Sequence, residues 1–168
     1  MRQVALVTGS SRGIGFAAAQ ALAKRGFALA VNGPFDDEEL RSAVSRLSET
    51  GASVMALPFD ITDLSVHAER LAQVEAELGP LTTLVNNAGV GVLQRGDLLD
   101  VSEASWDRCL TVNTKALFFL SQAFAKLLLS RPRPGGVFHS RVKGAGANPP
   151  AEAVPPTANS EAPAAPAQ

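Results

Sequence analysis

Residues 8–15 read Thr8-Gly9-Ser10-Ser11-Arg12-Gly13-Ile14-Gly15, and this stretch decides the fold. An apolar run over 4–7 precedes it, as expected for a strand buried on both faces, and a helical pattern follows it. The three glycines let the backbone turn tightly and approach a phosphate without side-chain clashes. The start of the helix then offers free N–H groups to the phosphates. The stretch predicts a pyrophosphate-binding turn; the alternative is a glycine-rich turn without a ligand.

Strands and helices alternate through the rest of the chain. Four apolar runs predict strands over 4–7, 27–31, 54–57 and 81–85. Apolar residues at helical spacing predict helices between Ile14 and Gly26, between the acidic run 36–39 and Gly51, over about 64–78 and over roughly 102–130. Right-handed crossovers then give a parallel sheet with helices on both faces and strand order 3-2-1-4. We therefore predict an α/β, doubly wound dinucleotide-binding domain.

The residues after the second predicted strand bear on the choice of dinucleotide. An NAD site usually places an acid there to bind the ribose 2′-hydroxyl, whereas this chain has Asn32-Gly33-Pro34. Arg12 lies in the glycine-rich turn, near the place where a 2′-phosphate would lie, and guanidinium pairs well with phosphate. We predict NADP(H), with NAD(H) as the alternative; a solvated surface position for Arg12 also stays open.

Composition excludes several classes of function. The chain carries 15 Lys+Arg and 16 Asp+Glu, so no overall field attracts nucleic acid or a membrane surface. Its one cysteine, Cys109, excludes an internal disulfide and a zinc cluster of cysteines, and no metal site is predicted. No apolar run approaches the length of a membrane span. The N-terminus leads directly into a strand without a signal peptide, so we expect a cytoplasmic protein.

Two further segments strengthen the interpretation. Asn86-Asn87-Ala88-Gly89 ends the fourth predicted strand, and Val112-Asn113-Thr114 lies in the last helix. Together with the glycine-rich turn, they resemble the short-chain dehydrogenase/reductase family, most of all its 3-oxoacyl-[acyl-carrier-protein] reductases, over roughly residues 3–130. The resemblance implies a Rossmann fold and NAD(P)(H)-dependent reduction of a small-molecule carbonyl. It also implies a homo-oligomer paired through the long helix, whose apolar residues core packing explains equally well.

The resemblance assigns roles by position. The residues expected to contact the cofactor are Gly9, Ser11, Arg12, Gly13, Ile14, Gly15, Asp60, Ile61, Asn86, Ala88 and Gly89. Asp60 would bind the adenine amine and Ile61 would line the ring, although Asp60 could instead be an acid at a helix start. The 86–89 segment could be an ordinary turn. Asn113 would hold a water of the proton relay; the alternative is an exposed helical asparagine.

The catalytic residues of the family are missing. Its chemistry needs Ser, Tyr and Lys, the last two as Tyr-x-x-x-Lys, whereas this chain has no tyrosine and no lysine after Lys143. Ser140 lies in roughly the expected region but in unmatched surroundings. We therefore predict an oxidoreductase by family that is catalytically impaired as this chain. The alternatives are a non-catalytic dinucleotide-binding module and an interaction module that docks on an intact homologue.

The composition changes near the C-terminus. From Gly144 to Gln168, 15 of 25 residues are Ala or Pro and none is Leu, Ile, Phe, Met or Trp. Such a segment buries too little apolar surface to become ordered. We predict a Rossmann domain over 1–140, incomplete relative to the family, and a disordered tail over 141–168. A truncation, or a shift of reading frame after about Gly136, would explain the change.

Overall fold

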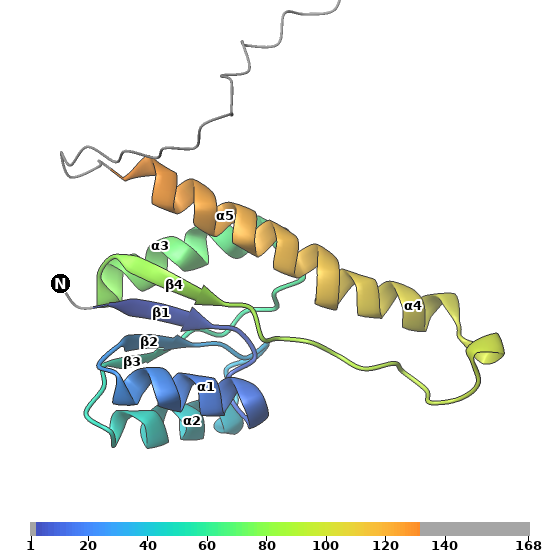
Figure 1. Ribbon diagram of the computed structural model, residues 1–168, viewed down its shortest axis with the longest axis horizontal. Helices are drawn as coiled ribbons and strands as arrows, with labels where there is room; N and C mark the ends of the chain where they lie inside the picture. Colours follow the sequence, from blue (N-terminus) through green and yellow to red (C-terminus); the bar gives the residue numbers. More distant parts are fainter. Residues whose placement is uncertain (1–2, 132–168) are drawn as a thin grey trace, which may run out of the picture. The chain divides into compact units, whose positions relative to one another are not determined.

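The computed structural model describes residues 3–131. Its four strands form one parallel sheet in the order β3-β2-β1-β4 (Figure 1). The strands are β1 (Val4–Val7), β2 (Ala28–Val31), β3 (Val54–Ala56) and β4 (Leu81–Val85). Val4 to Val7 pair in register with Ala28 to Val31 on one side of β1. The predicted α/β architecture, its parallel sheet and its strand order are confirmed.

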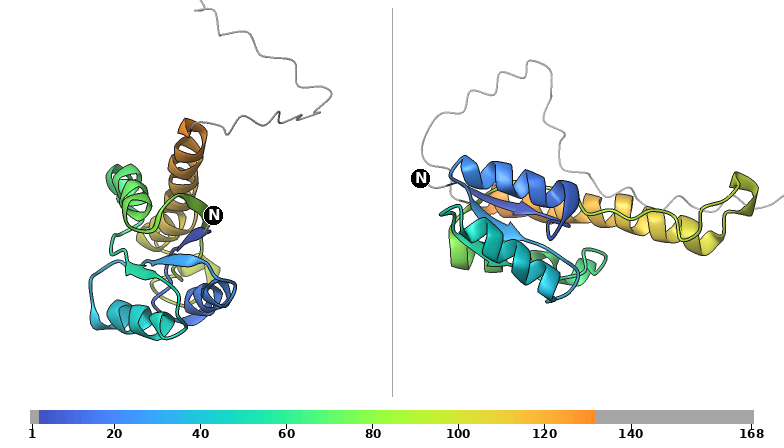
Figure 2. Two further views of the ribbon diagram at one scale, coloured as in Figure 1. Left: turned by 90° about the vertical axis from the view of Figure 1, so that its left-hand side faces the viewer. Right: turned by 90° about the horizontal axis from the view of Figure 1, so that it is seen from below.

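Helices cover both faces of this sheet. The helices α1 (Gly13–Lys24) and α2 (Glu38–Ser48) lie on one face, and α3 (His67–Leu78) and α5 (Leu117–Ser130) lie on the other (Figures 1 and 2). The 3₁₀ turn η1 (Leu64–Val66) precedes α3, so the predicted helix over 64–78 begins as a tighter turn, which Asp63 caps. A second 3₁₀ turn, η2 (Leu98–Asp100), lies in the loop before α4 (Glu103–Leu110).

Alternate residues of β1 enter two separate cores. Val4 and Leu6 belong to the cluster under α3 and α5, whereas Ala5 and Val7 belong to the cluster under α1 and α2. Because side chains of a strand point to opposite faces in turn, a strand covered on both sides is apolar throughout. All four residues of β1 are buried, which fixes it at the centre of the sheet.

The long C-terminal helix is interrupted by a π-helical segment. The predicted helix over 102–130 is present as α4, the π segment η3 (Thr111–Ala116) and α5 in direct succession. Thr111, Val112 and Asn113 are weak helix formers, and π turns gather at functional sites. The apolar spacing that predicts the helix does not reveal this change of pitch.

A buried hydroxyl joins the ends of β1 and β4. The Oγ1 atom of Thr8 accepts hydrogen bonds from the backbone N–H groups of Asn87 and Ala88, both at 3.0 Å. The same hydroxyl donates to the Val85 carbonyl at 3.4 Å, so its one donor and two acceptor positions are all used. The two loops that follow these strands are therefore held next to each other.

Some expectations concern other parts of the chain. The domain boundary at 140 and the tail over 141–168 lie outside the described residues.

Within residues 3–131, no helix is both long and apolar enough to cross a bilayer. The same range holds no cluster of three or more His, Cys, Asp or Glu side chains that could bind a metal ion.

Replacing Thr8 by Val tests the link between the two strand ends. The substitution keeps the shape but leaves two N–H groups without an acceptor, so we expect the free energy of unfolding to fall by about 1–3 kcal/mol. Thr8→Ser, the matched control, keeps the hydroxyl and loses one methyl group, which costs about 0.8 kcal/mol or less. Urea unfolding followed by circular dichroism measures both. Equal losses would contradict the role given to the hydroxyl.

Candidate cofactor site

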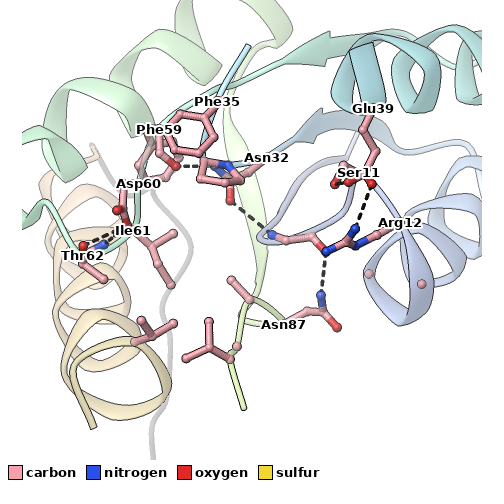
Figure 3. Close-up of a pocket in the computed structure, with 18 of the residues that line it drawn as sticks. Ser11, Arg12, Asn32, Phe35, Glu39, Phe59, Asp60, Ile61, Thr62 and Asn87 are labelled. Atoms are coloured by element: carbon pink, nitrogen blue, oxygen red, sulfur yellow. Dashed lines mark hydrogen bonds and ion pairs between the residues drawn. The ribbon is translucent and has the colours of Figure 1, made fainter. Parts of the chain in front are cut away.

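The main cavity lies at the carboxyl ends of the strands, where doubly wound sheets bind ligands (Figure 3). Its volume is about 940 Å³. Four loops form most of it: the glycine-rich turn after β1 and the loops after β2, β3 and β4. The junction between α4 and η3 completes the lining. The lining residues are Gly9, Ser11–Gly15, Asn32, Pro34, Phe35, Asp37, Glu39, Phe59–Thr62, Asn87–Val90, Asp107, Arg108, Thr111 and Val112.

The glycine-rich turn has the shape that anion binding requires. Gly9 and Gly13 adopt φ angles of 59° and 57°, which favour glycine. A Cβ atom on Gly15 would lie 2.3 Å from the Gly9 carbonyl oxygen and 2.4 Å from Asn87 Nδ2. Any larger residue at 15 would therefore push α1 away from the strand ends. Gly15 sets how closely the first turn of α1 approaches the cavity.

The N-terminus of α1 is left open to a ligand. Within residues 3–131, no side chain caps α1, whereas Asp37 caps α2 and Ser102 caps α4. The first backbone N–H groups of a helix have no partner within that helix and carry a partial positive charge. In α1 these groups belong to residues that line the cavity. The arrangement suits a phosphate or diphosphate.

The carboxylate of Glu39 binds the polar side chains of the glycine-rich turn. Glu39 Oε1 accepts a hydrogen bond from the Ser11 hydroxyl at 2.5 Å, and its Oε2 lies 3.1 Å from Arg12 Nη1 (Figure 3). The side chains of Arg12 and Glu39 are 82% and 43% exposed, so the ion pair is accessible to solvent. The sequence does not predict this role for Glu39, because an acidic run such as 36–39 is typical of any helix start.

Asn32 joins the glycine-rich turn to the loop after β3. Its Oδ1 accepts from the Gly9 N–H at 3.2 Å, and its Nδ2 lies within 3.1 Å of the carbonyls of Gly33, Leu57 and Phe59. This side chain is buried, so its amide is satisfied by backbone groups rather than by water. In the sequence, Asn32 stands out only as an asparagine at the end of a buried strand, where an NAD site usually has an acid.

The loop after β3 brings Asp60 and Ile61 to the cavity wall, and their contact with a cofactor stays a prediction. Asp60 Oδ1 accepts from the N–H and the hydroxyl of Thr62, both at 2.9 Å, whereas Oδ2 has no hydrogen-bond partner within residues 3–131 and can accept from a ligand. The acid that caps the following helical turn is Asp63, not Asp60. The Ser65 hydroxyl, then the Ser65 N–H, lower the pKa of Asp63.

The segment after β4 contributes unequally. Ala88 and Gly89 line the cavity, and so does Asn87, whose Nδ2 donates to the carbonyls of Thr8 and Gly9 at 2.9 Å. Asn86 does not line it, since its Nδ2 donates to the Ser121 hydroxyl of α5 at 2.8 Å. Asn86 therefore lies outside the cavity lining, and its predicted contact with a cofactor stays a prediction. Neighbouring residues at a strand end point to opposite sides, which separates the two asparagines.

Asn113 lies in the π segment and holds the loop after β4. Its Oδ1 accepts from the Val90 N–H at 2.8 Å and its Nδ2 donates to the Val90 carbonyl at 2.9 Å. Both polar atoms of the side chain thus bind the backbone of a single residue, Val90. The side chain secures the loop that includes Gly89 and Val90, which line the cavity.

These groups match the chemistry of a dinucleotide. Open helix N–H groups suit its diphosphate, the free oxygen of Asp60 suits an amino group, and Ile14 and Phe35 expose apolar surface at 83% and 70%. Ser11 and Arg12 also line the cavity, and a hydroxyl and a guanidinium are groups that bind phosphate. The described residues include no tyrosine, in keeping with the absence of tyrosine from all 168 residues.

Comparisons with known proteins agree with this geometry. Residues 3–146 match the family described as short chain dehydrogenase, a match that continues past the change of composition near Gly136. Gluconate 5-dehydrogenase of Gluconobacter oxydans is 38% identical over 129 residues, which is 77% of this chain and 49% of that protein. The chain spans about half the length of the curated relatives it matches.

Solved structures share the fold. A 3-oxoacyl-[acyl-carrier protein] reductase from Brucella melitensis, in complex with NAD, superposes with a TM-score of 0.73 at 36% identity. The similarity covers 79% of this chain and 52% of the reductase. A metagenomic short-chain oxidoreductase in complex with NADP superposes with a TM-score of 0.68 at 36% identity. This similarity covers 76% of this chain and 57% of the oxidoreductase.

Proposed function

The chain belongs to the short chain dehydrogenase family, and we propose on that premise that its cavity binds a nicotinamide dinucleotide. The observation that carries the proposal is the uncapped N-terminus of α1 beside Gly9 and Gly15, at the carboxyl ends of β1 and β4. Two structural relatives that hold NAD and NADP support the same ligand class. The fold alone would not be enough, because one fold hosts many functions.

Each part of the cavity has a role in this proposal. The N–H groups of α1 bind the diphosphate, Asp60 accepts from the adenine amine, and Ile61 packs on the ring. Ala88 and Gly89 form the floor beside the nicotinamide ribose. When bound, the nicotinamide ring supplies or accepts a hydride. Asn113 contributes by holding the 89–90 loop and, as the family resemblance suggests, at the proton-relay position.

The proposed reaction class is that of the family, the reduction of a small-molecule ketone or 3-oxoacyl group. Reduction of a carbonyl needs a proton as well as a hydride, and the family takes it from a tyrosine hydroxyl. The 168 residues contain no tyrosine. We therefore propose that this polypeptide binds the dinucleotide and lacks the proton donor for turnover.

Ligand binding and turnover can be measured separately. We expect NADPH or NADH to raise the melting temperature, because a ligand that binds only the folded state stabilises it by about 2.7 kcal/mol at a hundredfold excess over Kd. We expect oxidation of NADPH in the presence of a ketone to stay at background. Gly15→Ala serves as the control, because the added methyl group displaces the first turn of α1 and should remove the diphosphate site. No melting shift with either dinucleotide would refute the binding proposal, and turnover by the purified chain would refute the account of the tyrosine.

We also propose that NADP(H) is preferred, by a margin that Glu39 limits. Arg12 is the cation available to a 2′-phosphate, but Glu39 neutralises it and would face the phosphate itself. Binding of NADP(H) therefore requires Arg12 to exchange a carboxylate for a phosphate. NAD(H) has no 2′-phosphate and leaves the ion pair intact.

Charge substitutions test this preference. We expect Glu39→Gln to raise the affinity for NADPH relative to NADH by about five- to tenfold, equal to about 1–1.4 kcal/mol. Arg12→Ala should lower the same ratio. Asp36→Asn is the matched control, since Asp36 forms an exposed ion pair with Arg41 at the same helix start but does not line the cavity. Fluorescence titration gives both dissociation constants; an unchanged ratio in Glu39→Gln would exclude its role.

A second candidate function is that of an interaction module on an intact homologue. It is favoured by exposed apolar side chains on α4 and α5, which include Trp106, Leu110, Phe118 and Leu129. Isolated exposed apolar residues are ordinary, but several on one continuous helix indicate a binding surface.

Introducing charge on this helix tests the second candidate. We expect Trp106→Asp combined with Phe118→Asp to abolish co-sedimentation with a full-length relative such as the gluconate 5-dehydrogenase. Leu93→Asp, an exposed apolar residue of the loop before α4, is the control. Sedimentation velocity of the mixtures measures the effect. Wild-type chain that never co-sediments would remove this candidate while leaving dinucleotide binding intact.

A further inference from the structure

His67 is a buried polar side chain that the proposed function does not use. It is the first residue of α3 and only 2% exposed. It lies in none of the segments that carry the family resemblance. An imidazole is costly to bury without a hydrogen bond, so its partner indicates what it does there.

The partner is the loop after β3. His67 Nε2 lies 2.8 Å from the Ile61 carbonyl oxygen. Because a carbonyl oxygen only accepts, Nε2 must carry a hydrogen, and it does so in the neutral and the protonated ring alike. The ring also meets the Phe59 ring edge-on, with centroids 6.2 Å apart and an interplanar angle of 73°. His67 therefore contacts the residues on both sides of Asp60.

The loop is fixed at its other end as well. Asn32 Nδ2 lies 3.0 Å from the carbonyls of Leu57 and Phe59, where the loop leaves β3. Asp60 Oδ1 binds the N–H and hydroxyl of Thr62 within the loop. Between these two anchors, the direction of the free Asp60 oxygen depends on where the Ile61 peptide is held. His67 is the side chain that holds it.

We propose that His67 is a positioning residue for recognition of the purine ring: its hydrogen bond to Ile61 orients Asp60 to accept from a 6-amino group. The proposal rests on the dinucleotide binding proposed above. A carboxylate attracts the 6-amino group of adenine and repels the 6-oxo group of hypoxanthine. A site that positions one acceptor rejects an analogue without the matching donor more strongly than a loose site does.

The experiment compares two ligands that differ at this one group. Reduced nicotinamide adenine dinucleotide and reduced nicotinamide hypoxanthine dinucleotide are titrated against the whole chain and its variants. We expect the wild type to prefer the adenine form, and His67→Phe to lower that preference by about five- to tenfold, since the ring contact with Phe59 remains but the N–H donor is lost. His67→Gln keeps a donor and should retain most of the preference.

Controls separate positioning from general destabilisation. Asp60→Asn should lose the preference in the same way as His67→Phe. Leu47→Ala removes a buried side chain from the opposite face of the sheet and should lower stability while keeping the preference. If His67→Phe is too unstable to titrate, His67→Leu carries the same expectation.

The outcomes are distinct. A loss of preference in His67→Phe with retention in Leu47→Ala supports the proposal. Equal weakening of both ligands by His67→Phe overturns it, as does a wild type that binds both ligands equally. A wild type that binds neither ligand instead refutes the proposed dinucleotide site itself.

Discussion

The close approach of two turns is the constraint on which the rest of the site depends. The turn after β1 and the turn after β4 touch so tightly that a Cβ atom on Gly9 would lie 2.8 Å from the Ala88 Cα. Asn87 holds this contact by donating two hydrogen bonds to Thr8, from its backbone N–H to Oγ1 and from its Nδ2 to the carbonyl. Because only glycine fits at position 9, the first turn of α1 stays close to the carboxyl ends of the strands. Its free N–H groups therefore face the cavity and not the core.

Buried polar groups extend this constraint to the remaining walls. Asn32 ties the Gly9 N–H to the carbonyls at the end of β3, and His67 ties the Ile61 carbonyl to α3. Asn113, which is exposed, holds Val90 in a similar way through both its backbone N–H and its carbonyl. In each case a side chain binds backbone, which fixes a loop by its peptide units and leaves the loop side chains free for a ligand. Glu39 differs, because its carboxylate binds the side chains of Ser11 and Arg12 and not the backbone of a loop.

Local patterns in the sequence predict the fold, but they identify only part of the cavity lining. Apolar runs and helical spacing place the strands within a residue of their bounds, and the motifs place Gly15, Asp60 and Gly89 at the cavity. The residues that these patterns miss are those whose role depends on the direction in which the side chain points. Whether Asn86 or Asn87 enters the cavity depends on the twist at the end of β4. Whether Glu39 returns to Arg12 depends on the angle at which α2 leaves its loop, which spacing along the chain does not contain.

The structure also separates two requirements of carbonyl reduction. Holding a dinucleotide needs the carboxyl ends of parallel strands and an open helix N-terminus, and residues 3–131 supply both. Moving a proton needs a hydroxyl whose pKa is matched to the task, and no residue in this chain is a tyrosine. The first requirement is met by backbone groups and buried amides that pack with the core, so it does not depend on the second. The groups that suit a dinucleotide therefore lie within residues 3–131, whereas the tyrosine that the family's reaction uses is absent from the 168 residues.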